Sequence, residues 1–254
     1  RLGYTTYGIH SWEKSGYSRE KIYKLLGFDY AWFKENLGNL QFGRSGYSSD
    51  QSTYEVYYDI MNNKPDDEKN FSFIVTMQNH LPYNDVDPNG IQFLDGDNDI
   101  ISYLQSEYLA DMALKNLIDY LSEYKEDVIV LFFGDHQPNL NQKDLYSLTG
   151  NYAEDSASQV VPFFIWANFD INKKDNIETS ANYLESLLLE TAGMPKDSYT
   201  KYVESVREEI PVITNHYYMN NDGDSYEVSD SSSPYFDKLQ EYWRVIYYNM
   251  FDNK

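Results

Sequence analysis

The tripeptide Gly134-Asp135-His136 combines residue types that point to metal chemistry. It directly follows the apolar run 128–133, so its carboxylate and imidazole are expected at the mouth of a buried strand. An oxygen and a nitrogen donor on adjacent residues can bind one divalent cation such as Mn²⁺ or Zn²⁺. A metal site needs about four ligands, however. The structural alternative is an Asp that caps a turn beside an exposed His.

Three of the four histidines follow strand-like runs. His10 ends the β-branched and aromatic run 3–9, His80 follows the run 71–77, and His136 follows the run described above. Ligands of open α/β sheets gather at the carboxyl ends of the strands, so the three are candidate site residues. Because polar residues end strands in any fold, placement alone leaves a functional and a structural role equally open.

An aromatic ring and an arginine lie near the start of the first predicted helix. Tyr17 and Arg19 flank Ser18, a candidate N-cap, and the helix is expected to run to Leu26 with Gly27 ending it. The guanidinium fork suits phosphate or carboxylate oxygens, and the ring could stack on a small polyol. The alternative is an ordinary helix start whose arginine pairs with a surface glutamate.

Strand-like and helix-like segments alternate along the chain, which is typical of an α/β fold. The apolar runs are continuous rather than alternating, so we expect strands that helices cover on both faces. The further predicted segments are helices at 53–62, 100–124, 179–192 and 239–251, a strand at 160–167, and loops at 38–52, 85–99 and 220–233. A single domain is the simplest interpretation.

The composition excludes several classes of protein. With 20 Lys and Arg against 41 Asp and Glu, the net charge of −21 argues against nucleic-acid binding through a basic surface. The same charge repels an anionic membrane unless something tethers the chain. A hydrophobic content of 41% excludes a disordered chain, and the absence of cysteine excludes disulfides and thiolate metal sites.

The order of five segments resembles a known family: GYTTYGIH, YSREKIYKLLGFD, FIVTMQNHLPY, VIVLFFGDHQP and VVPFFIWA. It is similar to the sulfatase-like extracellular domain of lipoteichoic acid synthases and related phosphoglycerol transferases. The resemblance runs from about Gly3 to Met194. It implies an alkaline-phosphatase/sulfatase-like α/β fold, a three-layer sandwich with a mostly parallel central sheet covered by helices on both faces. We expect one sulfatase-like domain over 1–254, with its core at about 3–194 and a C-terminal extension at 195–254.

The resemblance also implies a metal site. Members of the family bind one divalent cation, Mn²⁺ or Mg²⁺, through a Glu, a nucleophilic Thr and an Asp-His pair that Asp135 and His136 match; Zn²⁺ is a further option. The family's Glu and Thr lie upstream of the stretch that matches 3–10, and neither Thr5 nor Thr6 matches the nucleophile. We therefore expect a chain that lacks its N-terminal part, binds metal weakly or not at all, and is inactive by itself.

The substrate residues implied by the resemblance are His10, Tyr17, Arg19 and His80. Tyr17 stands where the family has Trp, which keeps stacking possible but leaves the polyol open. The implied activity is transfer of phosphoglycerol from a phosphatidylglycerol-type lipid through the upstream Thr. The implied partners are an anionic phospholipid head group and a polyol or glycolipid acceptor. Upstream transmembrane helices would tether the domain to the extracellular face of the membrane.

Two alternatives remain open at this stage. One is another sulfatase-superfamily enzyme, such as a sulfatase or a phosphoethanolamine transferase, which the upstream nucleophile would distinguish. The other is a non-catalytic module that binds a cell-wall polymer, for which the 26 tyrosines could supply aromatic platforms.

Overall fold

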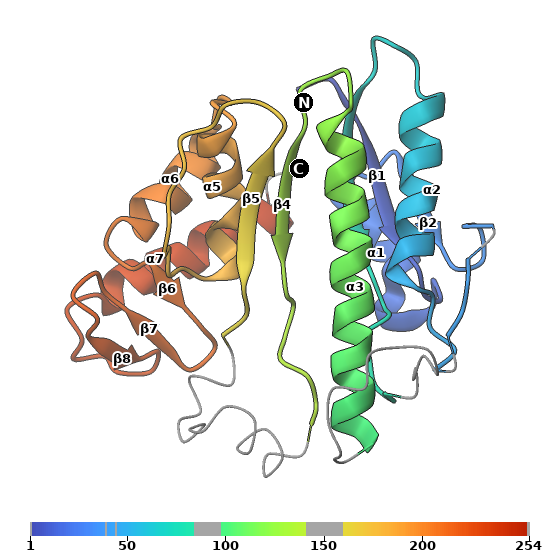
Figure 1. The fold of residues 1–254 in the computed structure, drawn as a ribbon. Helices are drawn as coiled ribbons and strands as arrows, with labels where there is room; N and C mark the ends of the chain where they lie inside the picture. The colour runs from blue at the N-terminus through green and yellow to red at the C-terminus, as the bar shows by residue number, and fades with distance from the viewer. Residues whose placement is uncertain (1, 39, 44, 84–97, 141–159, 253–254) are drawn as a thin grey trace. The chain divides into compact units, whose positions relative to one another are not determined.

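The computed structural model describes the chain except residues 1, 39, 44, 84–97, 141–159 and 253–254 (Figure 1). The loop predicted at 85–99 therefore lies almost entirely outside the described residues. The chain divides into two compact units. Unit 1 contains residues 1–123 and 134–161, and unit 2 contains residues 124–133 and 162–254.

Unit 1 is built on a parallel sheet with the strand order β2-β1-β3. The strands are β1 (Tyr4–His10), β2 (Tyr30–Phe33) and β3 (Lys69–Val75). His10 pairs with the last residue of each neighbouring strand, so all three strands end at the same level. This register gathers the residues that follow the strands along one edge of the sheet, where ligands of α/β folds bind.

Among the described residues of unit 1, three α-helices accompany the sheet: α1 (Arg19–Leu26), α2 (Asp50–Asn63) and α3 (Asn98–Ser122). The predicted end of α1 is confirmed, because Gly27 adopts a φ of 85° at the C-cap. Helix α2 begins three residues before the predicted start. The Ser49 hydroxyl accepts a hydrogen bond from the Ser52 amide at 3.2 Å, which makes Ser49 the N-cap. Part of the segment predicted as a loop is therefore helical.

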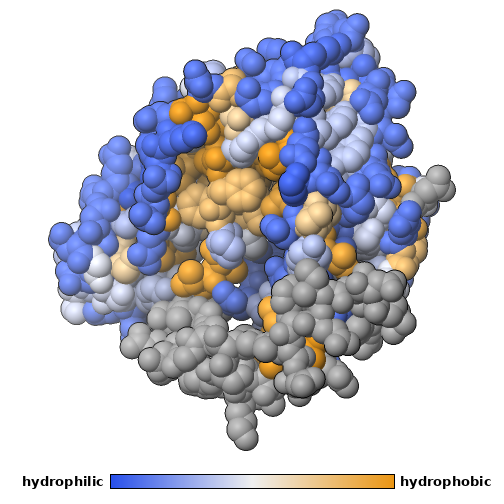
Figure 2. Space-filling view, in the orientation of Figure 1, coloured by the Kyte–Doolittle hydropathy of each residue, from blue (hydrophilic) through white to orange (hydrophobic). Residues whose placement is uncertain are grey.

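Two strands of unit 2 form an antiparallel pair, β4 (Ile129–Phe133) and β5 (Phe163–Ala167). Strand β5 begins three residues after the predicted start at 160, directly after Pro162, which has no amide N–H to donate to a strand partner. Figure 2 shows a largely hydrophilic face on which hydrophobic residues gather over these two strands.

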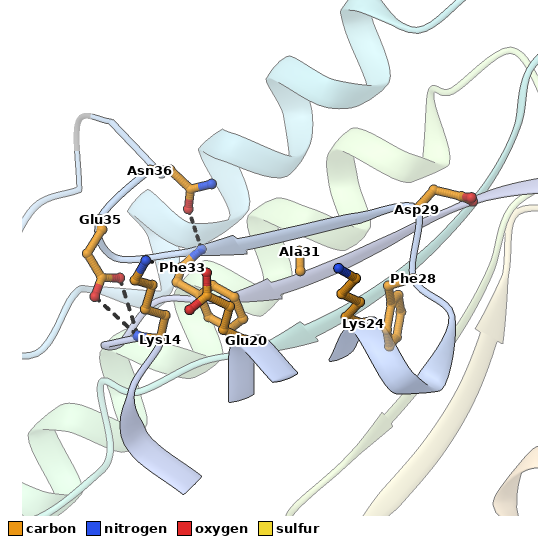
Figure 3. A pocket seen from close by; sticks show the side chains of 9 residues that line it. All are labelled: Lys14, Glu20, Lys24, Phe28, Asp29, Ala31, Phe33, Glu35 and Asn36. Carbon is orange, nitrogen blue, oxygen red and sulfur yellow. Dashed lines mark hydrogen bonds and ion pairs between the residues drawn. The ribbon is translucent and has the colours of Figure 1, made fainter. Parts of the chain in front are cut away.

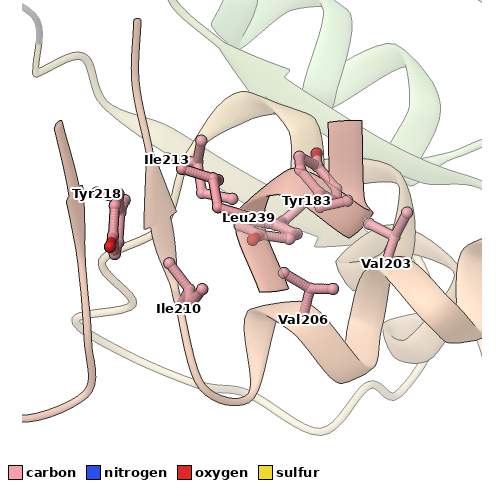
Figure 4. Close-up of a cluster of buried hydrophobic side chains, with 8 residues drawn as sticks. Tyr183, Val203, Val206, Ile210, Ile213, Tyr218 and Leu239 are labelled. Atoms are coloured by element: carbon pink, nitrogen blue, oxygen red, sulfur yellow. The ribbon is translucent and has the colours of Figure 1, made fainter. Parts of the chain in front are cut away.

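The rest of unit 2 is a helical cluster with a small sheet. Its elements are α5 (Leu184–Thr191), α6 (Ser198–Arg207), β6 (Val212–Ile213), β7 (Tyr217–Met219), β8 (Ser225–Glu227) and α7 (Phe236–Tyr247). The prediction that 220–233 is only a loop is wrong, because β8 pairs with β7 there. The predicted C-terminal helix is confirmed in α7. Figure 4 shows the core, in which Tyr218 and Leu239 are fully buried.

The core of unit 2 gives a direct test of the packing. Leu239→Ala is expected to lower the free energy of unfolding by about 2–5 kcal/mol, because it removes a side chain that is 0% exposed. Urea denaturation measures this loss, with the 71% exposed Leu25→Ala as the matched control. An equal effect of both substitutions would contradict the packing described here.

Candidate functional site

His10 lies at the end of β1 and is 4% exposed. Burial lowers the pKa of its imidazole to about 4, with the nearby Arg19 guanidinium adding to the effect and the Asp135 carboxylate opposing it. His10 is therefore neutral at pH 7, when its ring carries one hydrogen-bond donor and one acceptor. Its Nδ1 has no partner within the described part of the chain. Arg19 and Asp135, predicted from different segments, thus both lie within electrostatic range of His10.

The turn before α1 holds the Arg19 guanidinium in place. Tyr17 and Ser18 have φ angles of 52° and 55°, which are unusual for residues other than glycine. The Arg19 guanidinium donates a hydrogen bond to the Glu13 carbonyl at 3.0 Å and lies 5.2 Å from the centroid of the Tyr17 ring. A Cβ atom on Gly16 would lie 2.4 Å from Nη1 of Arg19. Gly16 therefore leaves the space that the guanidinium occupies.

His80 lies five residues beyond the end of β3, in an exposed segment. Its Nδ1 lies 2.7 Å from the Leu81 carbonyl oxygen, and because that oxygen can only accept, Nδ1 carries the proton. In the neutral ring this leaves Nε2 as an acceptor. The Tyr47 ring lies against His80 with a centroid separation of 5.0 Å.

Asp50 supports this segment from the first turn of α2. Its carboxylate accepts a hydrogen bond from the Gln78 amide at 3.4 Å, while its own amide donates to Oε1 of Gln78 at 3.0 Å. Burial raises the pKa of the Asp50 carboxyl to about 7, although hydrogen bonds from Gln78 and Thr76 oppose the rise. The sequence interpretation missed Asp50, since the Ser49-Asp50 pair was assigned to a loop. The available signal was its N-cap pattern.

Helix α3 supplies the second set of supports. Gln78 donates from Nε2 to the Ser106 carbonyl at 2.9 Å, and Asn79 donates from Nδ2 to Oε1 of Glu107 at 2.8 Å. The Ser106 hydroxyl contacts Oδ1 of Asn79 at 2.6 Å. The two residues before His80 are therefore fixed by side-chain hydrogen bonds to two helices.

Asp135 and His136 follow β4 as predicted, and both side chains are exposed. Nδ1 of His136 lies 2.8 Å from the Gln137 carbonyl oxygen, which must accept its proton. The neutral ring therefore presents Nε2 as a lone pair, and Nε2 lies 3.5 Å from Oδ2 of Asp135. Two donors that each lie about 2.1 Å from one tetrahedral ion are about 3.4 Å apart, so the pair fits a shared cation.

The pair is not completed by other side chains in the described ranges. Among those residues, no group of three or more His, Cys, Asp or Glu side chains could hold a metal ion. A hydrogen bond does link the segment after His136 to the His80 segment, because the Asn139 amide donates to the Tyr83 hydroxyl at 3.0 Å. The structure therefore ties together the segments that carry His80 and His136.

A pocket of about 470 Å³ opens between α1 and β2 (Figure 3). Two of its charged residues form an ion pair, with the Lys14 ammonium 3.4 Å from Glu20, and the Lys14 backbone amide donates to the Glu35 carboxylate oxygens at 3.3 Å. None of the six predicted site residues lines it. The pocket is therefore separate from the residues that the sequence singled out.

A solved structure described as a protein in the alkaline phosphatase superfamily, from Vibrio parahaemolyticus, superposes on the chain with a TM-score of 0.66 at 16% identity, covering 99% of this chain and 67% of that one; the shared fold confirms the predicted fold class. More narrowly, the chain belongs to the sulfatase family, whose model, described as "Sulfatase", matches residues 1–194. This match confirms the family resemblance drawn from the sequence.

Individual proteins give more distant similarities. The chain is 29% identical over 241 residues to a putative cyclic β-1,2-glucan modification protein of Rhizobium meliloti, and this match covers 87% of the chain and 37% of that protein. It is 25% identical over 150 residues to lipoteichoic acid synthase 1 of Bacillus subtilis, covering 53% of the chain and 21% of the synthase. The chain thus spans well under half the length of these relatives.

A solved structure has the same fold. Phosphoglycerol transferase GacH of Streptococcus pyogenes, in complex with sn-glycerol-1-phosphate, superposes with a TM-score of 0.73 at 20% identity. The superposition covers 100% of this chain and 63% of GacH. Within the ranges described, no helix has the length and apolar character needed to cross a membrane.

Proposed function

We propose that this chain is part of a metal-dependent phosphoglycerol transferase that acts on a phosphatidylglycerol-type lipid through a Thr nucleophile outside the 254 residues. The observation that carries the proposal is the convergence of His10, Arg19 and Asp135 at the carboxyl edge of the unit 1 sheet. The similarity to GacH, which was solved with a glycerol phosphate, supports the choice of substrate.

Each predicted substrate-binding side chain is proposed to contact a different part of the lipid head group. The Arg19 fork holds two phosphate oxygens, and a protonated His80 ring would donate from Nε2 to a third. The neutral His10 ring hydrogen-bonds a glyceryl hydroxyl, while Tyr17 covers the glyceryl carbons. Because the whole chain carries a charge of −21, the Arg19 guanidinium and a bound metal ion must attract the anionic head group locally.

Asp135 and His136 would hold the cation, with Mn²⁺ or Mg²⁺ as the proposed ion. A bound divalent cation neutralises phosphoryl charge and lowers the pKa of a hydroxyl nucleophile. The Gln137 carbonyl fixes the His136 tautomer that this role needs. The remaining ligands, including the nucleophile, are proposed to come from another part of the polypeptide.

The proposed acceptor is a polyol or the sugar of a glycan or glycolipid. The name of the Rhizobium meliloti relative, a glucan modification protein, favours a saccharide. We place the reaction at the extracellular face of the membrane, where membrane-spanning segments outside this chain would tether the domain to its lipid.

The proposal is tested with the full-length protein, Mn²⁺ and a fluorescent phosphatidylglycerol analogue, by measuring the release of diacylglycerol. His136→Ala is expected to reduce the rate at least about tenfold, because it removes one of the metal ligands. His216→Ala is the matched control, since His216 is an exposed histidine of unit 2. Full activity of His136→Ala, or no diacylglycerol from the unaltered protein, would overturn the proposal.

A further inference from the structure

Four residues of unit 1 form a group that we call the aromatic cluster: Trp12, Lys34, Phe42 and Tyr47. The Lys34 ammonium lies 4.0 Å from the centroid of the Trp12 ring and 5.0 Å from that of Phe42. Trp12 and Tyr47 have a centroid separation of 4.5 Å. The cluster is thus a row of rings with a cation held between two of them.

The aromatic cluster lies at the same edge of the sheet as the candidate site. Trp12 is two residues beyond the end of β1, and Lys34 is the first residue beyond β2. The Lys34 amide donates to the Trp12 carbonyl at 3.1 Å. At its other end, Tyr47 contacts His80, a proposed phosphate-binding residue. The cluster therefore extends from the position proposed for the transferred group.

A short hairpin holds the outer part of the cluster in place. Phe42 and Ser48 form an antiparallel bridge, and the Gly43 amide donates to the Tyr47 carbonyl at 2.9 Å. The buried Ser48 hydroxyl donates to the Ser11 carbonyl at 3.4 Å, next to Trp12 in the chain. The rings are thus supported by backbone and side-chain hydrogen bonds rather than by burial in a core.

The aromatic cluster is accessible to solvent, and the proposed transferase chemistry assigns it no role. Phe42 is 47% exposed, and Lys34 forms no ion pair among the residues that the structure describes. If Phe42 served only the hydrophobic core, its ring would be buried. A lysine at the surface of so acidic a chain usually forms an ion pair with a carboxylate. An exposed ring beside an ammonium that has no carboxylate partner among the described residues has the features of a ligand platform.

We propose that the aromatic cluster binds a neutral hexose ring of the acceptor glycan, an assignment that rests on the proposed transferase function. The apolar C–H face of a sugar ring packs against an aromatic ring, here Phe42, while its hydroxyls accept hydrogen bonds from the Lys34 ammonium. Trp12 holds Lys34, and Tyr47 extends the platform from Trp12 to His80. An acceptor hydroxyl is thereby presented beside the transferred phosphoglycerol.

The first test measures binding of a linear β-glucan hexasaccharide to the full-length protein by calorimetry. Phe42→Ala and Lys34→Met are each expected to weaken binding about tenfold, since each removes one part of the platform. Phe251→Ala is the matched control, because Phe251 is 56% exposed in unit 2. Thermal unfolding of each variant shows whether it is folded, and Phe42→Tyr, which keeps the ring, is expected to restore binding.

The second test separates this proposal from the transferase function. In the transfer assay, Phe42→Ala is expected to raise the KM for the hexasaccharide about tenfold while kcat changes less than about threefold. Glycan binding that Phe42→Ala weakens, in a protein that transfers nothing, would refute the transferase function and keep the binding site. Transfer with an unchanged acceptor KM, or glycan binding that Phe42→Ala leaves intact, would refute the binding site alone.

Discussion

Replacing Asp50 by Asn is expected to raise the free energy of unfolding at pH 8 by about 4 kcal/mol, the equivalent of a pKa shift of about three units. The effect follows from the raised pKa of Asp50, from its ordinary 3.8 to about 7. Ionising this carboxyl means placing a charge in a buried site, with Glu107 of α3 and Tyr54 of its own helix near it. The Asn side chain keeps an oxygen that accepts from the Gln78 amide, so the substitution removes the charge and preserves the contact.

The direction of the pH dependence follows from proton linkage. Between pH 4 and pH 7 the folded chain retains the Asp50 proton, whereas the unfolded chain has lost it. The unfolded state therefore binds fewer protons, and stability falls as the pH rises through this window. At pH 4 the unaltered chain and Asp50→Asn should have similar stability, and the difference should grow until about pH 7 and then level off.

Urea denaturation at pH 4, 6 and 8 measures this prediction, with Asp59→Asn as the control. Asp59 is an exposed residue of the same helix, so its substitution should not alter the slope of stability against pH. Parallel stability curves for Asp50→Asn and the unaltered chain would show that Asp50 is ionised at little cost in the folded state.

Local signals in the sequence predicted the strands and helices that are long or clearly capped. The apolar run ending at Phe133 became β4, and Gly27 ended α1 as expected. Strand β2 and the β6-β7-β8 sheet were missed because strands of two to four residues carry too short a pattern. Such strands are specified by pairing with distant residues, which a local pattern does not contain.

The same distinction applies to the candidate site. Residue type and position at strand ends nominated His80, Asp135 and His136. Burial of Asp50 was not predictable, because it depends on α2 and α3 packing around the end of β3. The aromatic cluster was not predictable either, since it joins Trp12 after β1, Lys34 after β2 and Phe42 in the hairpin. Buried polar contacts such as those of Asp50, and surface groups such as the aromatic cluster, can therefore be identified only from the tertiary structure.

The strongest loss of transferase activity is expected from Arg19→Lys. The ammonium of lysine cannot reproduce the bidentate fork, so kcat/KM for the donor lipid should fall by about 10²–10³. Gly16→Ala should reduce it in the same direction, because the added Cβ would lie 2.4 Å from Nη1 and displace the guanidinium. The diacylglycerol assay with the full-length protein measures both effects, and Arg244→Lys, at an exposed position of unit 2, is the matched control.

Together, Arg19→Lys and Gly16→Ala distinguish a requirement for the positive charge of Arg19 from a requirement for the position of its guanidinium. If Arg19 acted only as a positive charge that attracts an anionic lipid, Arg19→Lys would retain most of the activity and added salt would weaken whatever remained. If the fork must lie where the turn holds it, Gly16→Ala loses activity with the arginine still present. Retained activity in both variants would remove Arg19 from the proposed site. The acidic chain would then have to attract its lipid through the metal and the exposed histidines alone.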